Sequence, residues 1–142
     1  MIGKAYVSTF KYYDNRTHRM AFKNRPVLIV GKADSGDYVI LPISRVTNQG
    51  NIDGYYDVPI DPVDVPLMNL TQRSYIRTHK QSVVHLGELT REIVDFRSEY
   101  EDMYLDVISK MEEFQKKPYI ERIIKAVDFS TIFFAGVYYT IL

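Results

Sequence analysis

A basic stretch close to the N-terminus carries residue types that could bind single-stranded nucleic acid. Between Lys11 and Arg25, five cationic side chains accompany one carboxylate, and aromatic rings and a histidine lie among them: Tyr12, Tyr13, His18 and Phe22. Cations contact phosphates, and aromatic rings stack on unpaired bases. An imidazole, with an ordinary pKa of about 6.5, can take up or release a proton near neutral pH. The same composition is also typical of a solvated loop that keeps a chain soluble.

Arg25 is the cation with the best-defined surroundings, because it begins a nearly continuous apolar run that ends at Val30. Its guanidinium can fork onto two phosphate oxygens and stays charged, so it could stabilise the charge that develops when a phosphodiester is cleaved. For the same reason it is a poor general base. A place where a basic loop enters a rigid strand favours precise positioning. The alternative is a surface arginine at a strand end.

The elements that would position these side chains are short strands. Alternation of apolar and polar residues, together with apolar runs, predicts strands at residues 4–11, 25–30, 38–44, 55–60, 71–77 and 82–86. Residues 12–24 have no period and are expected to form a long loop. Pro26 and Pro42 are expected at a strand end, an edge or a bulge, because proline cannot donate to a sheet ladder.

A helix is predicted after the strands. From Thr90 to Phe114 the apolar residues recur at steps of three and four, which predicts an amphipathic helix of about seven turns. Thr90 is the expected N-cap, and Pro118 is expected to stop or kink the helix. Residues 119–128 allow a short second helix. Many short strands followed by a helix indicate an α+β, mainly β fold: a bent antiparallel sheet or barrel covered by a long C-terminal helix.

The charges are balanced overall but segregated along the chain. The 142 residues include 18 Lys or Arg and 18 Asp or Glu, so the formal net charge is zero. This excludes a globally basic nucleic-acid binder and an acidic disordered tail. Residues 1–50 carry eight bases and three acids, whereas residues 91–117 carry five bases and eight acids. The length is that of one domain, residues 1–142, with enough chain to bury a core.

The sequence predicts neither a metal site nor a cofactor. There is no cysteine, which excludes a disulfide, a thiolate metal site and a cysteine nucleophile. No cluster of histidines and carboxylates has the spacing of metal ligands. His79 and His85 are weaker candidates for chemistry than His18, since His85 alternates with apolar residues of a predicted strand.

The chain is expected to be cytoplasmic. Its N-terminus lacks an apolar run followed by small cleavage-site residues, so no signal peptide is expected. The most apolar stretch, Phe129 to Leu142, has 14 residues and is too short to span a bilayer as one helix. Attachment to a membrane surface is disfavoured because no cluster of bases flanks this stretch. We expect it to pack on the rest of the chain or at a protein interface.

Four segments, in order along the chain, resemble elements of the MazF/PemK (Kid) ribonuclease toxins of type II toxin–antitoxin systems. Residues 24–30 resemble the R-P-V-L-V-I strand of that family, and residues 39–44 resemble its strand ending in P-I-T/S. Residues 75–78, Tyr-Ile-Arg-Thr, resemble its Q-I-R-T element. Residues 84–89, followed by a helix, resemble its I-x-x-L segment and C-terminal helix.

The resemblance runs from about Gly3 to Phe114, which makes residues 3–117 the family-like core and residues 118–142 an extension. It implies an SH3-like small barrel of bent antiparallel strands that forms a homodimer. It also implies metal-independent cleavage of single-stranded RNA, at a short preferred sequence, to 2′,3′-cyclic phosphate and 5′-hydroxyl ends. A cognate antitoxin protein would neutralise the toxin by covering the RNA groove with its tail.

The resemblance also assigns roles to particular residues. It places Arg25 and Ser44 at catalytic positions, and one branch of the family has a catalytic histidine at about the place of His18. Ser44, where the family usually has threonine, could donate its hydroxyl to the scissile phosphate or else satisfy local backbone. Further candidates for RNA contact are basic, amide or aromatic: Tyr13, Lys23, Asn24, Arg45, Arg73, Tyr75, Arg77 and Lys80. The alternative for each of these residues is a structural role or simple exposure to solvent. Arg77 in particular could stabilise the barrel or the dimer.

Two departures from the family keep other functions open. Residues 12–24 lack the glycines common in the family's loop, and Gln72 and Ser74 stand where one branch has a catalytic Arg-x-Asp pair. A second hypothesis is therefore a non-catalytic barrel that binds RNA or a protein. A third is a relative that acts on a protein target such as gyrase. For the ribonuclease, residues 12–24 and 46–54 are expected to shape the RNA groove.

Overall fold

The computed structural model describes the backbone of residues 1–126 and the side chains of residues 1–117. Within this part the chain forms seven strands: β1 (Ala5–Asp14), β2 (Arg19–Asp34), β3 (Asp37–Ser44), β4 (Asp57–Ile60), β5 (Ser74–Arg77), β6 (Ser82–His85) and β7 (Leu89–Val94). Three short 3-10 turns connect them: η1 (Gln49–Asn51), η2 (Pro66–Met68) and η3 (Leu86–Glu88). The helices are α1 (Phe96–Glu99) and α2 (Glu101–Ala126).

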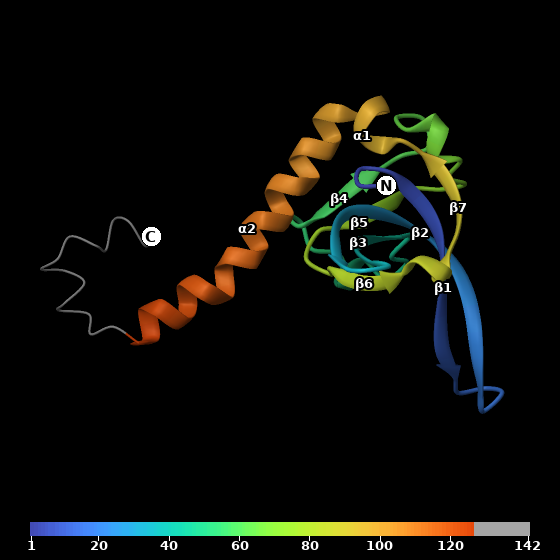
Figure 1. The fold of residues 1–142 in the computed structure, drawn as a ribbon, viewed down its shortest axis with the longest axis horizontal. Coiled ribbons are helices and arrows are strands. Elements are labelled where there is room, and N and C mark those ends of the chain that lie inside the picture. Colours follow the sequence, from blue (N-terminus) through green and yellow to red (C-terminus); the bar gives the residue numbers. More distant parts are fainter. Residues whose placement is uncertain (127–142) are drawn as a thin grey trace, which may run out of the picture.

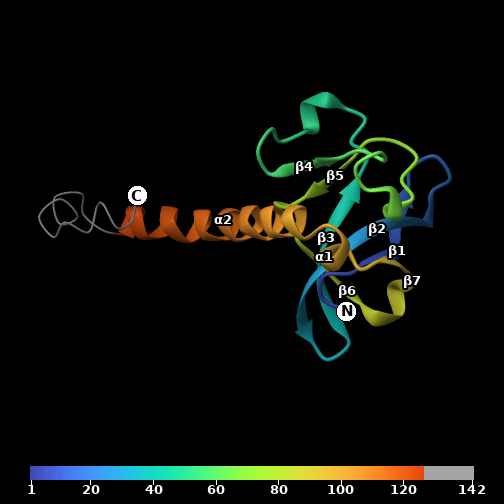
Figure 2. The ribbon, with the colours of Figure 1, turned by 90° about the horizontal axis from the view of Figure 1, so that it is seen from above.

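The strands form a curled antiparallel sheet in the order β4-β5-β3-β2-β1-β7, with β6 paired to the first half of β3. β3 pairs with β6 through residues 37–40 and with β5 through residues 43–44. The two ends of β3 therefore have different neighbouring strands in the curled sheet. The sheet closes into a half-barrel, from which α2 and the β1–β2 hairpin project in different directions (Figure 1, and from above in Figure 2). The predicted fold class, a bent antiparallel sheet with a C-terminal helix, is confirmed.

Two apolar clusters lie on the two faces of β2 and β3. Leu28 and Leu41 belong to the larger cluster, whereas Val27, Ile29 and Ile40 belong to the smaller one, and all five are fully buried. Burial of both faces explains why this part of β2 is a continuous apolar run instead of an alternating pattern. The rigid centre of the sheet therefore begins two residues after the position of the candidate arginine.

The expected loop at residues 12–24 is wrong, because the structure has a β-hairpin there. β1 and β2 pair over ten residue pairs, out to Asp14 and Arg19. In the turn, Asp14 Oδ1 accepts a hydrogen bond from the Arg16 amide at 2.9 Å. The outer half of the hairpin projects beyond the barrel, so both of its faces meet solvent (Figure 1). A ribbon with no buried face needs no alternation of apolar and polar residues, and pairing alone satisfies its backbone.

The two prolines lie where the sheet changes partners. Pro26 is inside β2, opposite Val7 of β1 and one residue before β2 begins to pair with β3. Pro42 lies in β3 between the segment that pairs with β6 and the segment that pairs with β5. The missing N–H of each proline therefore falls beside an interruption of the ladder.

The predicted helix start at Thr90 is also wrong. Residues 89–94 form β7, which pairs with β1. The helical segment begins after Asp95, whose side chain accepts a hydrogen bond from the backbone of the first turn. The helical spacing extends back into β7 because Ile93 packs against the same core as Phe96, although it does so from a strand.

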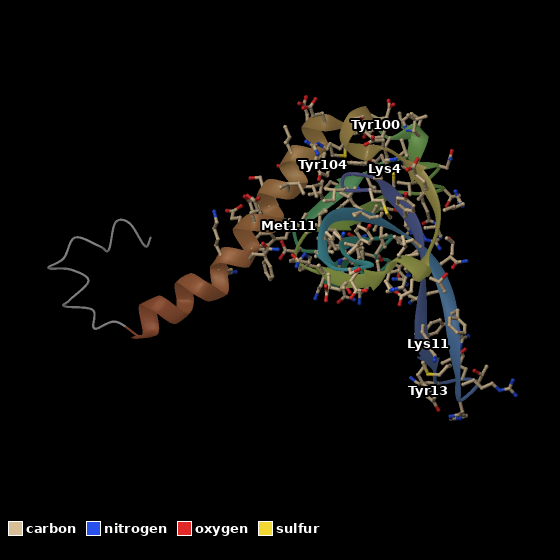
Figure 3. The ribbon with its side chains drawn as sticks, in the orientation of Figure 1. Lys4, Lys11, Tyr13, Tyr100, Tyr104 and Met111 are labelled. Carbon is tan, nitrogen blue, oxygen red and sulfur yellow. The ribbon has the colours of Figure 1, made fainter. Side chains whose placement is uncertain are left out.

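The first half of α2 packs on the barrel. Tyr104, Val107 and Met111 are buried in the larger core, and Figure 3 shows Tyr104 and Met111 on the part of the helix that runs along the sheet. One turn further, Phe114 meets Tyr56 edge to face, with ring centroids 5.0 Å apart. These contacts tie the helix to the core and to the connection between β3 and β4.

α2 continues through Pro118 to Ala126, so of the two predicted effects of this proline, a stop or a kink, the stop does not occur. Proline inside a helix removes one backbone hydrogen bond from the ladder. The expected second helix at 119–128 is the end of α2, as far as the described residues reach. The apolar stretch Phe129 to Leu142 lies outside the described residues. Within the described part, no helix is long and apolar enough to cross a bilayer.

Candidate nucleic-acid cleft

A cleft of about 800 Å³ opens at the larger core, where β2 and β3 meet the connection between β4 and β5. Its apolar lining comes from five segments of the chain and includes Val7, Pro26, Ile43, Met68 and Ile93, of which Ile43 and Met68 are buried in the larger core. The sheet therefore collects, around one hollow, residues that lie far apart in the sequence.

Four cations line the cleft: Lys23, Arg25, Arg45 and Arg91. None of them forms an ion pair with a carboxylate of the described residues. The lining, as far as the described residues define it, includes no Asp, Glu or His. Burial, followed by the nearby charge of Arg25, lowers the pKa of Lys23. Unpaired cations around one hollow are the electrostatic footprint of a site for phosphate groups.

The two strands at the centre of the sheet bring Arg25 and Ser44 to the same cleft. β2 and β3 are antiparallel, with Val27 opposite Pro42. In that register, the residues before the buried run of β2 lie beside the end of β3. Ser44 also pairs with Tyr75 of β5, so it is the last position of β3 with a partner on that side. Both candidates thus adjoin the fully buried centre of the sheet.

Strained backbone lies directly beside these candidates. Val46, with φ of 42°, and Asn69, with φ of 54°, adopt the left-handed conformation, and both line the cleft. This conformation is unusual for a β-branched residue and costs on the order of 1–3 kcal/mol. Val46 turns the chain immediately after Ser44 and Arg45. Strain of this kind clusters at functional sites, which supports a functional role for the cleft.

The remaining polar lining is uncharged. Amide and hydroxyl side chains contribute it: Asn24, Thr47, Asn69, Thr71, Gln72 and Ser74. Asn69, Thr71 and Gln72 come from the β4–β5 connection, and Ser74 begins β5. The cleft therefore combines cations from the sheet with neutral hydrogen-bonding groups from a connecting segment.

Five of the predicted site residues lie together in the cleft: Lys23, Asn24, Arg25, Ser44 and Arg45. His18 and Tyr13 do not line it, because they lie on the projecting part of the hairpin, where Figure 3 shows Tyr13. His18 is in the turn, with φ of 55°. At the usual rise of a strand, roughly 20 Å of extended chain separates it from Arg25.

The hairpin extends outward from the cleft. Cross-strand pairs at every second position share one of its faces: Val7–Pro26, Thr9–Asn24, Lys11–Phe22 and Tyr13–Met20. Lys23 and Arg25 alternate with these residues and lie on the other face, where Lys23 Nζ is 4.8 Å from the centre of the Tyr12 ring. The innermost members of the series line the cleft. Further out, Phe22 is 66% exposed and Tyr13 is 53% exposed. Two aromatic rings therefore extend from the cleft along the ribbon, where they could stack on unpaired bases.

Arg77 is held outside the cleft by an ion pair with a buried carboxylate. Its Nε and Nη2 donate to the two oxygens of Asp57 at 3.0 and 3.3 Å, and Nη2 also donates to the Asn51 carbonyl at 2.8 Å. The Asp57 side chain is fully buried and that of Arg77 is 19% exposed. This geometry supports the structural alternative for Arg77, which joins β5 to the connection between β3 and β4.

The other candidates near β5 also lie outside the cleft. The Arg73 guanidinium is 5.7 Å from the centre of the Tyr75 ring, and its Nη1 is 3.4 Å from Asp61 Oδ2. Lys80 is exposed beyond the end of β5. Their assignment to RNA contact stays a prediction.

His79 packs against the aromatic contact that holds α2. Its ring centroid is 6.2 Å from that of Tyr56 and 5.9 Å from that of Phe114. Its Nδ1 is buried without a hydrogen-bond partner and lies 3.7 Å from Asp57 Oδ1. Burial lowers the pKa of His79, and the Asp57 charge opposes this. Within the described side chains, no group of three His, Asp or Glu residues is placed to hold a metal ion.

Sequence reasoning missed Arg91 and the polar segment of the β4–β5 connection. Arg91 was assigned to the predicted helix, whereas β7 places it in the cleft. Residues 71–73 were assigned to a strand that in fact begins at Ser74. The turn residue Asn69 was an available signal, since asparagine is enriched in the left-handed conformation.

The fold is similar to that of a known toxin. The chain matches the structure of the Mycobacterium tuberculosis toxin MazF-mt6 with a TM-score of 0.51 and 17% sequence identity, over 78% of this chain and 96% of the toxin. Neither a protein-family model nor a curated protein matches the sequence. The chain therefore has a MazF-like fold.

Proposed function

We propose that the protein is a toxin-type endoribonuclease that cuts single-stranded RNA without a metal ion, leaving 2′,3′-cyclic phosphate and 5′-hydroxyl ends. The observation that carries this proposal is the cleft. It gathers Arg25, Ser44 and Arg45 with two further cations, and no carboxylate is among its described lining residues. The MazF-like fold adds support.

The proposed reaction is an attack of the 2′-oxygen on the neighbouring phosphorus. The bond from phosphorus to the 5′-oxygen breaks, a base takes the 2′ proton, and an acid supplies a proton to the leaving oxygen. The cleft is equipped to stabilise the charge on the phosphorane between these steps. The guanidinium groups of Arg25 and Arg45 can fork onto its non-bridging oxygens, while the Ser44 hydroxyl donates a hydrogen bond.

Proton transfer is the step for which the cleft of one chain provides the fewest suitable groups. Its described lining offers hydroxyls, amides, three arginines and Lys23, whose pKa is lowered by burial. His18 is the best proton-transfer group in the sequence, but it lies roughly 20 Å along the hairpin from Arg25. A role for His18 therefore requires a second copy of the chain, in which one hairpin turn approaches the other cleft. Such an exchange fits the homodimer that we propose for the active form.

A protein antitoxin is the second proposed partner. Within the described residues, none of the four cations of the cleft forms an ion pair with a carboxylate. An acidic segment of another protein could therefore pair with them. Occupation of the cleft by such a segment would exclude RNA.

The test is incubation of the purified protein with a long single-stranded RNA in excess EDTA, with the fragment ends mapped. A DNA strand of the same sequence serves as the control, because it lacks the attacking 2′-hydroxyl. We expect discrete cuts in RNA alone, with cyclic-phosphate ends. Intact RNA, cuts in both strands, or activity abolished by EDTA would each contradict the proposal.

A non-catalytic RNA-binding module is the second candidate function. One observation favours it: no histidine or carboxylate is among the described lining residues. The two functions differ in turnover. A binding module would retain intact RNA in a stable complex, whereas the ribonuclease would cut an excess of RNA over protein.

A further inference from the structure

The cleft has two chemically different parts. Its cations come from β2, from the residue after β3 and from β7, whereas the amide segment, residues 69–72 (Asn-Leu-Thr-Gln), carries no charge. Cations bind the phosphates of any sequence and so do not distinguish one base from another. A side-chain amide holds a donor and an acceptor side by side, and this matches the edges of unpaired bases. The two parts of the lining therefore indicate two roles: the cations bind phosphates, and the amide segment recognises a base.

The amide segment is held firmly on its N-terminal side. The preceding residues Val65 and Met68 are buried in the larger core. Between them, the Leu67 amide donates to Tyr100 Oη at 3.0 Å, which anchors η2 to the start of α2. These contacts attach the N-terminal side of the segment to the barrel.

The amide segment is also fixed within itself and at its C-terminal end. Asn69 is held in the left-handed conformation, and its amide N–H donates to the Pro66 carbonyl at 3.2 Å. The Ser74 hydroxyl donates to the Gln72 carbonyl at 3.2 Å. Side chains on a backbone that is already fixed lose less entropy when they bind a ligand, so they can discriminate well.

Resting on the proposed function, we propose that Asn69 and Gln72 hydrogen-bond to the edge of an unpaired base beside the scissile phosphate, and thereby set the sequence preference of cleavage. Both side chains are exposed in the cleft that holds Arg25 and Ser44. The cations then supply affinity for any RNA strand, and the amide segment supplies the choice of site. This adds the amide segment to residues 12–24 and 46–54, which are expected to shape the groove.

The variants that test this proposal are Asn69→Gly and Gln72→Ala, singly and together. Glycine adopts a positive φ without strain, so Asn69→Gly removes the amide while leaving the turn possible. The control is Gln115→Ala, which removes an exposed amide of α2 that does not line the cleft. Each protein cuts a randomised single-stranded RNA pool in EDTA, and sequencing of the fragment ends gives the base preference at each position. Melting temperatures show that each variant is folded.

We expect the double variant to lose about tenfold or more of the discrimination at one position near the cut, in line with the worth of an amide–base contact. Gln115→Ala should keep the wild-type preference. If the folded double variant cuts with the wild-type preference, the inference is overturned while the ribonuclease stands.

If wild-type protein cuts no RNA, the proposed function has failed and the inference is decided by binding. The same pool is then selected for retention by wild-type protein and by the double variant. A motif enriched by wild type and lost in the double variant would support recognition by the amide segment. No enriched motif, or the same motif in both proteins, would overturn it.

Discussion

The ion pair between Arg77 and Asp57 gives a prediction that separates a structural role from an RNA contact. Replacement of Arg77 by methionine keeps an aliphatic side chain but leaves the Asp57 carboxylate, which is fully buried, without its partner. It also removes the hydrogen bond to the Asn51 carbonyl, and with it a tie between β5 and the β3–β4 connection.

The expected cost follows from the burial of the pair. Breaking a buried ion pair by removing one partner costs about 3–5 kcal/mol. Because Arg77 retains 19% exposure, water can partly compensate, and the lower end of the range applies. A loss of about 3 kcal/mol in the free energy of unfolding corresponds to a fall in melting temperature of roughly 10 °C for a chain of this size.

The assay is thermal and urea unfolding of Arg77→Met beside Arg73→Met. Arg73 contacts Asp61 at 3.4 Å with both side chains about half exposed, so its removal should cost less than about 1 kcal/mol. If Arg77→Met melts within about 2 °C of wild type and yet loses RNA binding, the structural role is refuted and the RNA contact is favoured.

Three further predictions concern the cleft, the hairpin and the buried histidine. Arg91→Ala should weaken RNA binding and reduce its dependence on salt concentration by about one phosphate contact, as measured by titration at several salt concentrations; an unchanged slope would remove Arg91 from the cleft's phosphate contacts. Phe22→Ala should weaken binding of single-stranded RNA by about 1–3 kcal/mol without altering the melting temperature, because the ring is exposed and free to stack; equal binding would show that the outer hairpin does not contact RNA. Burial lowers the folded-state pKa of His79, so its contribution to stability is present above the unfolded pKa of about 6.5 and is lost as pH falls toward the lower folded value. Unfolding of His79→Gln should therefore depend less on pH between about 7 and 5 than that of wild type or His85→Gln, and parallel curves would contradict this.

The buried centre of the fold could be predicted from the sequence, because burial leaves a strong pattern. The run after Arg25 and the strand ending at Ser44 are apolar on both faces, and the structure buries them completely at their centre. Arg25 and Ser44 adjoin these two strands. A correct prediction of the strands was therefore enough to bring both residues to one cleft. The helix was found for the same reason, although its N-cap was predicted at Thr90, five residues before Asp95.

The parts that sequence reasoning missed are those without a one-sided burial pattern. The outer hairpin has two solvated faces, and so the stretch at residues 12–24 has no alternation from which a strand could be inferred. β7 continues the helical spacing of the following residues because Ile93 packs on the same core as Phe96, and this hid Arg91. The position of His18 far from the cleft depends on that same hairpin. Spacing along the sequence suggested proximity to Arg25, whereas an extended ribbon separates the two.

The most direct test of the role of the cleft compares Arg25→Ala with Arg19→Ala. Both remove one exposed arginine from β2, but only Arg25 lines the cleft, while Arg19 pairs with Asp14 at the outer end of the hairpin. RNA cleavage in EDTA and the melting temperature are measured for both. We predict that both proteins melt like wild type, that Arg25→Ala loses cleavage by at least about a hundredfold, and that Arg19→Ala retains it. Cleavage by folded Arg25→Ala at the wild-type rate would contradict the assignment of this cleft as the catalytic site.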